Sequence, residues 1–195
     1  MKVTTLILLL LLCGNASTIL SQSKDDPYNA KDEMAKMLIA RANAFNSLVG
    51  QELPHFELEL VDKAILNSES LKGKPTVINF WFIYCAPCIE EMPILNSVKK
   101  EFGDKVNFVA ITYHNQKEIH EFLDYTDFDF IHAANAADYI KTIGMTGYPK
   151  TLILDENLVI KSIHKGIPKD AAMKKENKEN FRYQLINELK ELIKN

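Results

Sequence analysis

The sequence predicts an α/β fold in which a central mixed sheet is flanked by helices and preceded by a β-hairpin and an extra N-terminal helix. Two nearly continuous apolar runs, 76–83 and 106–112, have the composition of strands that are buried on both faces. Segments with the three- and four-residue spacing of apolar helix faces alternate with the strands. This alternation is typical of a sheet that is covered by helices on both sides.

The composition is that of an ordinary globular protein. The 195 residues are 47% hydrophobic and 25% charged, which argues against a disordered or low-complexity chain. The 23 basic and 26 acidic residues give a net charge of −3, without the basic excess that nucleic-acid binders normally show. We therefore expect no nucleic-acid partner, and we expect the chain to act as a monomer.

Residues 1–22 are interpreted as a signal peptide. Lys2 precedes an apolar run from Val3 to Cys13, and small and polar residues follow the run. One positive charge, about eleven apolar residues and a small-residue exit are typical of secretory signals, whereas a transmembrane helix needs ~20 apolar residues. Cleavage after Ala16 and cleavage near Ser21 both fit. A retained membrane anchor and a lipid attached to Cys13 are the alternatives to removal, and in each case we expect export to the periplasm or cell envelope.

Residues 23–50 are predicted to form an N-terminal helical arm. Asp26 and Pro27 suit the N-cap and the first position of a helix, and Gly50 is placed to end it. One face of the arm is apolar, and we expect it to pack on the main domain, with a partner-binding face as the alternative. The residues of that face are Met34, Met37, Leu38, Phe45, Leu48 and Val49.

Residues 51–195 carry the main domain. It is predicted to open with a strand around Phe56 and Leu58, a hairpin partner at 64–66 and a short helical turn that Gly73 closes. The later elements are predicted in the order strand 76–83, helix 87–102, strand 106–112, helix 116–123, extended piece 128–132, helix 136–143, hairpin strands 150–154 and 158–164, and an amphipathic helix from 170 onward. Pro93 lies inside the helix at 87–102 and is expected to kink it.

The motif that carries chemistry is Cys85-Ala-Pro-Cys88, between a buried strand and the helix that follows it. A thiol at a helix N-terminus faces free main-chain N–H groups and the positive end of the helix dipole, and both favour the thiolate. Such Cys-x-x-Cys thiols have pKa values lowered to ~3.5–7. Cys85 is therefore the expected nucleophile, and Cys88 is expected to resolve a mixed disulfide. If the signal peptide is removed, Cys13 leaves with it, and this pair forms the redox-active disulfide of an exported chain.

Other interpretations of the pair are a zinc site and a purely structural disulfide. A zinc site needs two further ligands, and the histidines are scattered without a close pair. These histidines are His55, His114, His120, His132 and His164. A loop as short as the one between Cys85 and Cys88 constrains little of the unfolded chain's entropy, so a structural disulfide here would stabilise poorly. We expect no metal and no organic cofactor.

Residues 79–93, Asn-Phe-Trp-Phe-Ile-Tyr-Cys-Ala-Pro-Cys-Ile-Glu-Glu-Met-Pro, resemble the active-site stretch of the thioredoxin superfamily. More narrowly, they resemble the exported TlpA/ResA-like thiol–disulfide oxidoreductases with redoxin-type domains. The resemblance extends over about 50–165. It covers Pro54-x-Phe-x-Leu58, the Leu-Lys-Gly-Lys at 71–74 and the Gly-Tyr-Pro at 147–149. It implies a thioredoxin-like fold and an exchange of thiols and disulfides with protein substrates.

The resemblance also implies roles at single positions. Pro149 is expected to form a cis peptide bond that faces the dithiol, and the main chain of Tyr148 is then free to pair with an extended substrate. Glu91 is expected to move the proton of the buried thiol, with a raised pKa; the alternatives are a solvent-facing Glu91 and a role for Glu90 instead. The expected substrate-binding residues are Trp81, Tyr84, Pro87, Tyr148 and Pro149.

Three positions depart from the family pattern. Tyr84 stands where Trp usually precedes the first cysteine, and Lys150 follows the proline where Thr is frequent. Asn79 stands where cytosolic thioredoxins have a buried Asp, so a proton relay through that position is not expected. These departures leave the reaction class intact and leave substrate preference open.

Two other functions fit the sequence less well than a thiol–disulfide oxidoreductase. A peroxiredoxin-like peroxidase would have Thr three residues before its cysteine, and neither Cys85 nor Cys88 has it. A thiolate copper carrier fits the soft ligands but lacks an obvious Met or His beside the cysteines. The expected partners are protein thiols or disulfides and a membrane or periplasmic redox partner. The sequence does not give the direction of electron flow.

Overall fold

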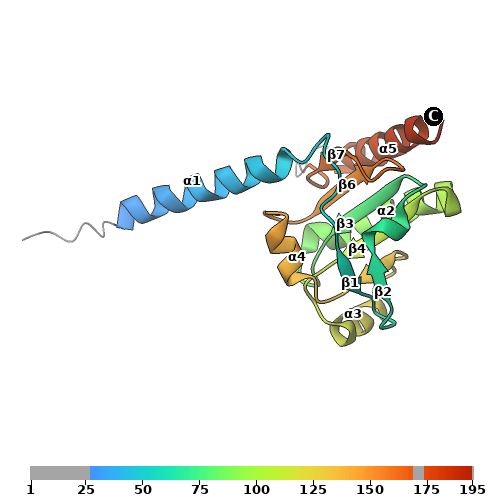
Figure 1. Ribbon diagram of the computed structural model, residues 1–195, viewed down its shortest axis with the longest axis horizontal. Coiled ribbons are helices and arrows are strands. Elements are labelled where there is room, and N and C mark those ends of the chain that lie inside the picture. The colour runs from blue at the N-terminus through green and yellow to red at the C-terminus, as the bar shows by residue number, and fades with distance from the viewer. Residues whose placement is uncertain (1–26, 169–173, 195) are drawn as a thin grey trace, which may run out of the picture. The chain divides into compact units, whose positions relative to one another are not determined.

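The computed structural model describes residues 27–168 and 174–194 (Figure 1). The predicted signal peptide therefore lies outside the described residues. Helix α1 (Pro27–Asn46) begins at the proline that the sequence predicts as its first residue. The chain divides into two compact units between Met37 and Leu38, inside this helix. In the described part of the chain, no helix is both long enough and apolar enough to cross a membrane.

The last turn of α1 belongs to the core of the second unit. Phe45 is only 1% exposed and packs in the same apolar cluster as Leu53 and Phe56, with Leu48 against its edge. Leu38, by contrast, is 48% exposed. Of the predicted apolar face, Phe45 near the end of α1 is therefore buried in this core, and Leu38 is not.

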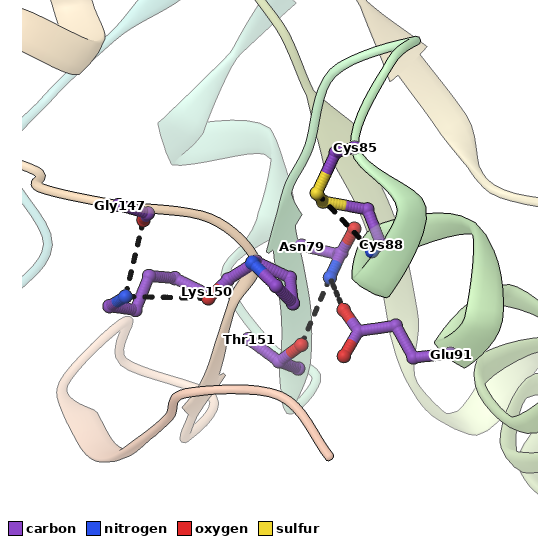
Figure 2. Close-up of a disulfide and its surroundings, with 8 residues drawn as sticks. Asn79, Cys85, Cys88, Glu91, Gly147, Lys150 and Thr151 are labelled. Atoms are coloured by element: carbon purple, nitrogen blue, oxygen red, sulfur yellow. Dashed lines mark hydrogen bonds between the residues drawn. A yellow bond between two sulfur atoms is a disulfide. The ribbon is translucent and has the colours of Figure 1, made fainter. Parts of the chain in front are cut away.

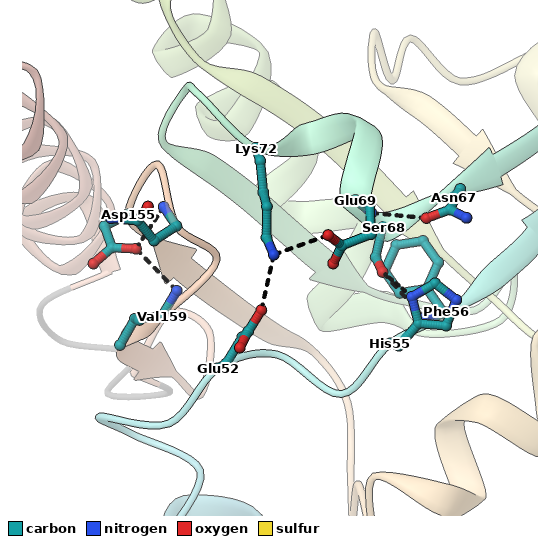
Figure 3. Close-up of polar contacts among 10 residues, drawn as sticks. Glu52, His55, Phe56, Asn67, Ser68, Glu69, Lys72, Asp155 and Val159 are labelled. Carbon is teal, nitrogen blue, oxygen red and sulfur yellow. Dashed lines mark hydrogen bonds and ion pairs between the residues drawn. The ribbon is translucent and has the colours of Figure 1, made fainter.

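A small hairpin follows, as the alternating pattern predicts. Strands β1 (Glu57–Glu59) and β2 (Ile65–Asn67) pair antiparallel. Asn67 then caps the 3-10 helix η1 (Ser68–Leu71) by accepting a hydrogen bond from the Glu69 N–H at 2.8 Å. Figure 3 shows Lys72 reaching both Glu52 and Glu69, at 3.0 and 2.9 Å. These contacts join the segment before the hairpin to the helical turn after it.

The central sheet has five strands in the order β5-β4-β3-β6-β7 (Figure 1). They are β3 (Thr76–Phe80), β4 (Asn107–Ile111), β5 (Ile131–Ala133), β6 (Lys150–Leu154) and β7 (Ile160–His164). Strands β3, β4 and β5 run parallel, whereas β6 and β7 are antiparallel to their neighbours. The predicted mixed sheet is confirmed.

Strand β3 ends three residues earlier than the predicted strand at 76–83. Its last ladder partners are opposite Phe80, and the Trp81 N–H still donates to the Ile111 carbonyl at 3.2 Å. The chain then leaves the sheet and enters the active-site turn. The prediction was too long because buried loop residues such as Trp81 extend the same apolar run.

Four helices surround the sheet and its connections. They are α2 (Ala86–Phe102), which is followed by the 3-10 turn η2 (Gly103–Lys105), α3 (Gln116–Leu123), α4 (Ala137–Thr142) and α5 (Lys174–Ile193). Asn115 and Glu118 form a reciprocal capping box at the start of α3. The polar residues 174–180 form the first turns of α5.

Alternate residues of the strands supply two separate cores. On one side Val77 and Ile153 pack with the apolar faces of α2 and α5, which include Leu95 and Leu185. On the other side Ile78 and Leu152 pack with the hairpin, the end of α1 and α4; that cluster includes Leu58, Phe45 and Ile140. Each fully buried aliphatic side chain contributes about 1.5–3 kcal/mol. The sheet is thus covered on both faces, as predicted, and the start of α2 is held at the end of β3.

Candidate active site

A disulfide between Cys85 and Cys88 lies at the N-terminus of α2 (Figure 2). Cys85 is the N-cap residue with extended backbone angles, and its Sγ accepts a hydrogen bond from the Cys88 N–H at 3.2 Å. The two Cα atoms are 5.2 Å apart. Free N–H groups and the positive end of the helix dipole therefore face the sulfur of Cys85, and both stabilise a thiolate there.

Access to the sulfurs is narrow. Cys88 is fully buried and Cys85 is 3% exposed, whereas the preceding Tyr84 is 85% exposed. The Cys85 N–H donates to the Phe82 carbonyl at 3.1 Å, which fixes the turn that presents the cysteine. Both cysteines are therefore buried in the disulfide form, and Cys85 lies next to the exposed Tyr84.

The peptide bond between Tyr148 and Pro149 is cis, as predicted. Pro149 immediately precedes β6, whose first residue Lys150 pairs with Phe80 at the end of β3. The cis bond thus lies at the same end of β3 from which the chain turns toward Cys85. Lys150 Nζ donates to the carbonyl of Gly147 at 3.1 Å and to that of Pro149 at 3.4 Å, so it bridges the two residues on either side of Tyr148 (Figure 2).

Glu91 is buried one turn along α2 from Cys88. Its Oε1 accepts a hydrogen bond from Asn79 Nδ2 at 2.8 Å, and the same amide nitrogen donates to Thr151 Oγ1 at 3.0 Å (Figure 2). Among the described residues, its Oε2 has no hydrogen-bond partner. Burial raises the pKa of Glu91 to about 8, against the lowering effects of the Asn79 hydrogen bond and the charge of Lys150. A carboxyl group with this pKa can exchange a proton near neutral pH.

Glu90 occupies a different environment. Its side chain is 33% exposed and forms an ion pair with Lys178 of α5 at 3.0 Å. The two alternatives that the sequence left open are therefore resolved in geometry: Glu91, not Glu90, faces the interior, and it is not a solvent-facing residue.

The predicted substrate-binding residues differ in accessibility. Tyr84 is exposed, Pro87 and Tyr148 are half-buried, and Pro149 is buried. Trp81, in contrast, is fully buried and packs against Phe122 and other rings beneath the turn. This burial corrects its predicted place on the substrate surface, because an indole with no exposed area supports the turn from below.

Three residues of this site were not predicted to take part in it. Asn79 and Thr151 hold the Glu91 carboxyl, and Gly166 lies against it, since a Cβ built on Gly166 would be 3.2 Å from Glu91 Oε2 and 2.6 Å from Pro149 Cγ. The signal for Asn79 and Thr151 is a polar residue inside an apolar strand. In the described ranges, no group of three or more His, Cys, Asp or Glu side chains is placed to hold a metal ion.

Sequence and structure comparisons agree with this geometry. Residues 48–180 match the Redoxin family. The thioredoxin-like protein YneN of Bacillus subtilis is 33% identical over 121 residues, which cover 60% of this chain and 71% of the relative. The thiol-disulfide oxidoreductase ResA of Bacillus thuringiensis subsp. konkukian is 27% identical over 154 residues, which cover 77% of this chain and 80% of the relative.

Solved structures share the fold. A thiol:disulfide interchange protein of the thioredoxin family from Chlorobium tepidum matches with a TM-score of 0.58 and 21% identity, over 73% of this chain and 95% of that one. The thioredoxin domain of a thiol-disulfide oxidoreductase from Bacteroides vulgatus matches with a TM-score of 0.58 and 15% identity, over 71% of this chain and 97% of that one. With its cysteine pair at the head of α2 and its cis-proline beside β3, the chain belongs to the Redoxin family, as a TlpA/ResA-like member of the thioredoxin superfamily.

Proposed function

We propose that this chain, a thioredoxin-type thiol–disulfide oxidoreductase, works outside the cytoplasm and reduces disulfides of protein substrates with the Cys85–Cys88 pair. The observation that carries the proposal is the disulfide at the N-cap of α2, where the helix favours a thiolate on the outer sulfur. The similarity to ResA and YneN supports the reaction class. The signal-like residues 1–22 support export to the periplasm or cell envelope.

The reduction proceeds in two exchanges. In the dithiol form, the Cys85 thiolate attacks one sulfur of the substrate disulfide, forms a mixed disulfide and releases the other substrate sulfur as a thiolate. The Cys88 sulfur, after losing its proton, then attacks Cys85 Sγ, which re-forms the Cys85–Cys88 bond and releases the second substrate thiolate. Two electrons pass from the protein to the substrate, and a membrane or periplasmic dithiol partner restores the reduced pair. The opposite direction would oxidise a substrate dithiol through the same intermediate.

The substrate chain is proposed to lie along the cis-proline. Among the described residues, no hydrogen-bond partner is found for the main-chain N–H or C=O of Tyr148. The carbonyls on either side of it are held by Lys150. An extended peptide can therefore pair with Tyr148 as an added strand, with Pro149, Pro87 and Tyr84 around the sulfurs.

Glu91 is proposed to act as the proton donor and acceptor for the inner thiol. It follows Cys88 by one helical turn, and its raised pKa keeps it protonated near pH 7. Its proton can pass to a departing Cys88 thiolate when the disulfide is reduced and return when the disulfide forms. The titrations of Cys85, Cys88 and Glu91 are then coupled, so each apparent pKa value describes the three groups together and not one residue.

Trapping of intermediates tests the assignment of the nucleophile. Cys88→Ala should accumulate mixed disulfides with substrate proteins, because the intermediate on Cys85 cannot be resolved. Cys85→Ala should accumulate none. Alkylation of the reduced protein at pH 6 should label Cys85 first, and faster labelling of Cys88 would overturn the assignment.

Redox titration tests the direction of electron flow. A reducing role predicts a potential near that of thioredoxin, about −270 mV, and an oxidising role predicts one near that of DsbA, about −120 mV. We expect the Cys85–Cys88 couple near the reducing end of this range. A potential at the oxidising end would reverse the proposed direction while leaving the reaction class unchanged.

A further inference from the structure

Three aromatic side chains meet beside the active-site turn, and their rings have no role in the reaction steps described above. Phe82 contacts Tyr148 with ring centroids 5.1 Å apart and planes at 79°. Tyr113 stacks against Phe82 at 6.1 Å and 26°, and contacts Tyr148 at 6.3 Å and 73°. We call these three residues the aromatic triplet. Each ring touches both of the others, so the triplet is one continuous surface.

The topology of the sheet brings the triplet to the cysteines. Phe82 follows β3 and Tyr113 follows the parallel strand β4, so both lie beyond the C-terminal ends of these strands, at the same end of the sheet. Tyr148 precedes β6, which runs antiparallel to β3, so Tyr148 lies at the same end of the sheet. The triplet is also bonded directly to the site, since the Phe82 carbonyl accepts the Cys85 N–H and Tyr148 forms the peptide bond to Pro149.

The triplet is accessible and uncharged. Tyr113 is 42% exposed, and Phe82 and Tyr148 are half-buried. Burial, with a contribution from the neighbouring Tyr113 phenol, raises the pKa of Tyr148 to about 12, so its hydroxyl stays neutral at physiological pH. The rings of the triplet therefore carry no charge at physiological pH, and the Lys150 ammonium lies nearby on the carbonyls of Gly147 and Pro149.

We propose that the aromatic triplet is a substrate subsite that selects an aromatic or large apolar side chain close to the attacked cysteine of the substrate polypeptide. This inference rests on the proposed function and adds to it the substrate class. In an extended peptide, residues two apart point to the same side. When the substrate cysteine meets Cys85 and its main chain pairs with Tyr148, a side chain two residues away lies over Phe82 and Tyr113. An aromatic ring there adds edge or offset contacts with the triplet.

The test uses two disulfide-containing peptides of otherwise identical sequence. One carries Phe, and the other Ser, two residues to each side of the cysteine. The reduced wild-type protein should show a higher kcat/KM for the Phe peptide. Tyr113→Ala should reduce the Phe-over-Ser ratio by about 2- to 10-fold, the range expected for the loss of one aromatic contact. Tyr113→Phe should preserve the ratio, because the ring remains.

The matched control is Tyr183→Ala, which removes another exposed tyrosine, at 66% exposure, from α5. It should change neither rate. Equal loss on both peptides in Tyr113→Ala, or no loss on either, would overturn the subsite. A small aromatic disulfide reagent distinguishes failure of the subsite from failure of the proposed oxidoreductase function. Reduction of the reagent without a Phe preference removes the subsite alone, whereas failure to reduce the reagent and both peptides removes the oxidoreductase function with it.

Discussion

Glu91 is held where its neutral form is favoured. Its Oε1 has one strong donor in Asn79, but its Oε2 is buried without a partner among the described residues. A buried carboxylate with an unpaired oxygen costs free energy that a protonated carboxyl does not. The positive charge that acts on Glu91 is that of Lys150, whose ammonium donates to two main-chain carbonyls. The surroundings of Glu91 therefore store a proton beside the disulfide.

This proton makes stability depend on pH. Below the ordinary carboxyl pKa of 4.5, Glu91 is protonated in both the folded and the unfolded chain. Between 4.5 and about 8 the unfolded chain releases the proton while the folded chain keeps it, so the free energy of unfolding falls as pH rises. For the oxidised protein we expect a loss of about 4 kcal/mol between pH 5 and pH 9 from this group. Urea unfolding in that range measures it.

Glu91→Gln should remove most of this pH dependence of the free energy of unfolding, and any other difference from the wild type should be the same at every pH. Glu90→Gln is the matched control, because it removes a half-buried ion pair with Lys178 on the neighbouring position. It should leave the slope with pH as in the wild type. Glu91→Gln should also flatten the pH dependence of the reduction potential between pH 6 and 9, and Glu90→Gln should not. Identical slopes in all three proteins would make Glu91 a structural residue only.

The active-site residues that the sequence alone could identify lie within one short motif. Cys85, Cys88 and Glu91 lie on one helix start, where spacing alone sets their relation. Asn79, Thr151 and Gly166 meet the same carboxyl from β3, from β6 and from the segment after β7. Their convergence depends on strand register, which one sequence does not reveal. The burial of Trp81 was misjudged for the same reason, because its exposure depends on rings that come from distant segments.

Among the elements, the segment after β7 constrains the site from outside. Gly166 has φ +81°, and a Cβ added there would lie 2.6 Å from Pro149 Cγ and 3.2 Å from Glu91 Oε2. Only a residue without a side chain lets this segment pass so close to the cis-proline and the carboxyl. The segment thereby excludes solvent from Glu91.

Gly166→Ala should lower the free energy of unfolding by about 1–3 kcal/mol, because a ring carbon of Pro149 must shift and the backbone angle is strained. Gly144→Ala is the matched control. It has a similar φ of +69° but no atom within 4 Å of the built Cβ, so it reports the backbone strain alone. We expect Gly166→Ala to cost more than Gly144→Ala in chemical denaturation. Equal costs would mean that the contact with Pro149 is easily relieved.

The ends of α3 and β3 show where a sequence pattern is enough to predict the boundary of an element and where it is not. The predicted helix at 116–123 matches α3 to the residue, and the capping box of Asn115 and Glu118 defines its start in the structure. The end of β3 was predicted three residues late. Hydrophobic pattern reports burial, and at Trp81 burial continues after the hydrogen-bonded ladder stops.

At the scale of the whole molecule, the sheet separates two apolar cores, and a different helix covers each of them. The core that holds the disulfide is completed by α5, through Phe181, Leu185 and Leu189. The opposite core is completed by Phe45 from the end of α1. The predicted main domain began at residue 51, which would leave Phe45 outside it. The compact unit instead begins at Leu38.

A comparison of two shortened chains tests which boundary is physical. A chain that begins at Leu38 retains Phe45, whereas a chain that begins at Gln51 loses it and leaves a hole in the apolar cluster to which Leu53 and Phe56 belong. We expect the shorter chain to be less stable than the longer one by about 3–5 kcal/mol, the usual cost of deleting a buried Phe side chain. Phe45→Ala in the full chain should lose a similar amount, as measured by urea unfolding of the oxidised protein. If both shortened chains unfold at the same urea concentration, the last turn of α1 contributes nothing to this core, and the domain starts where the sequence pattern places it.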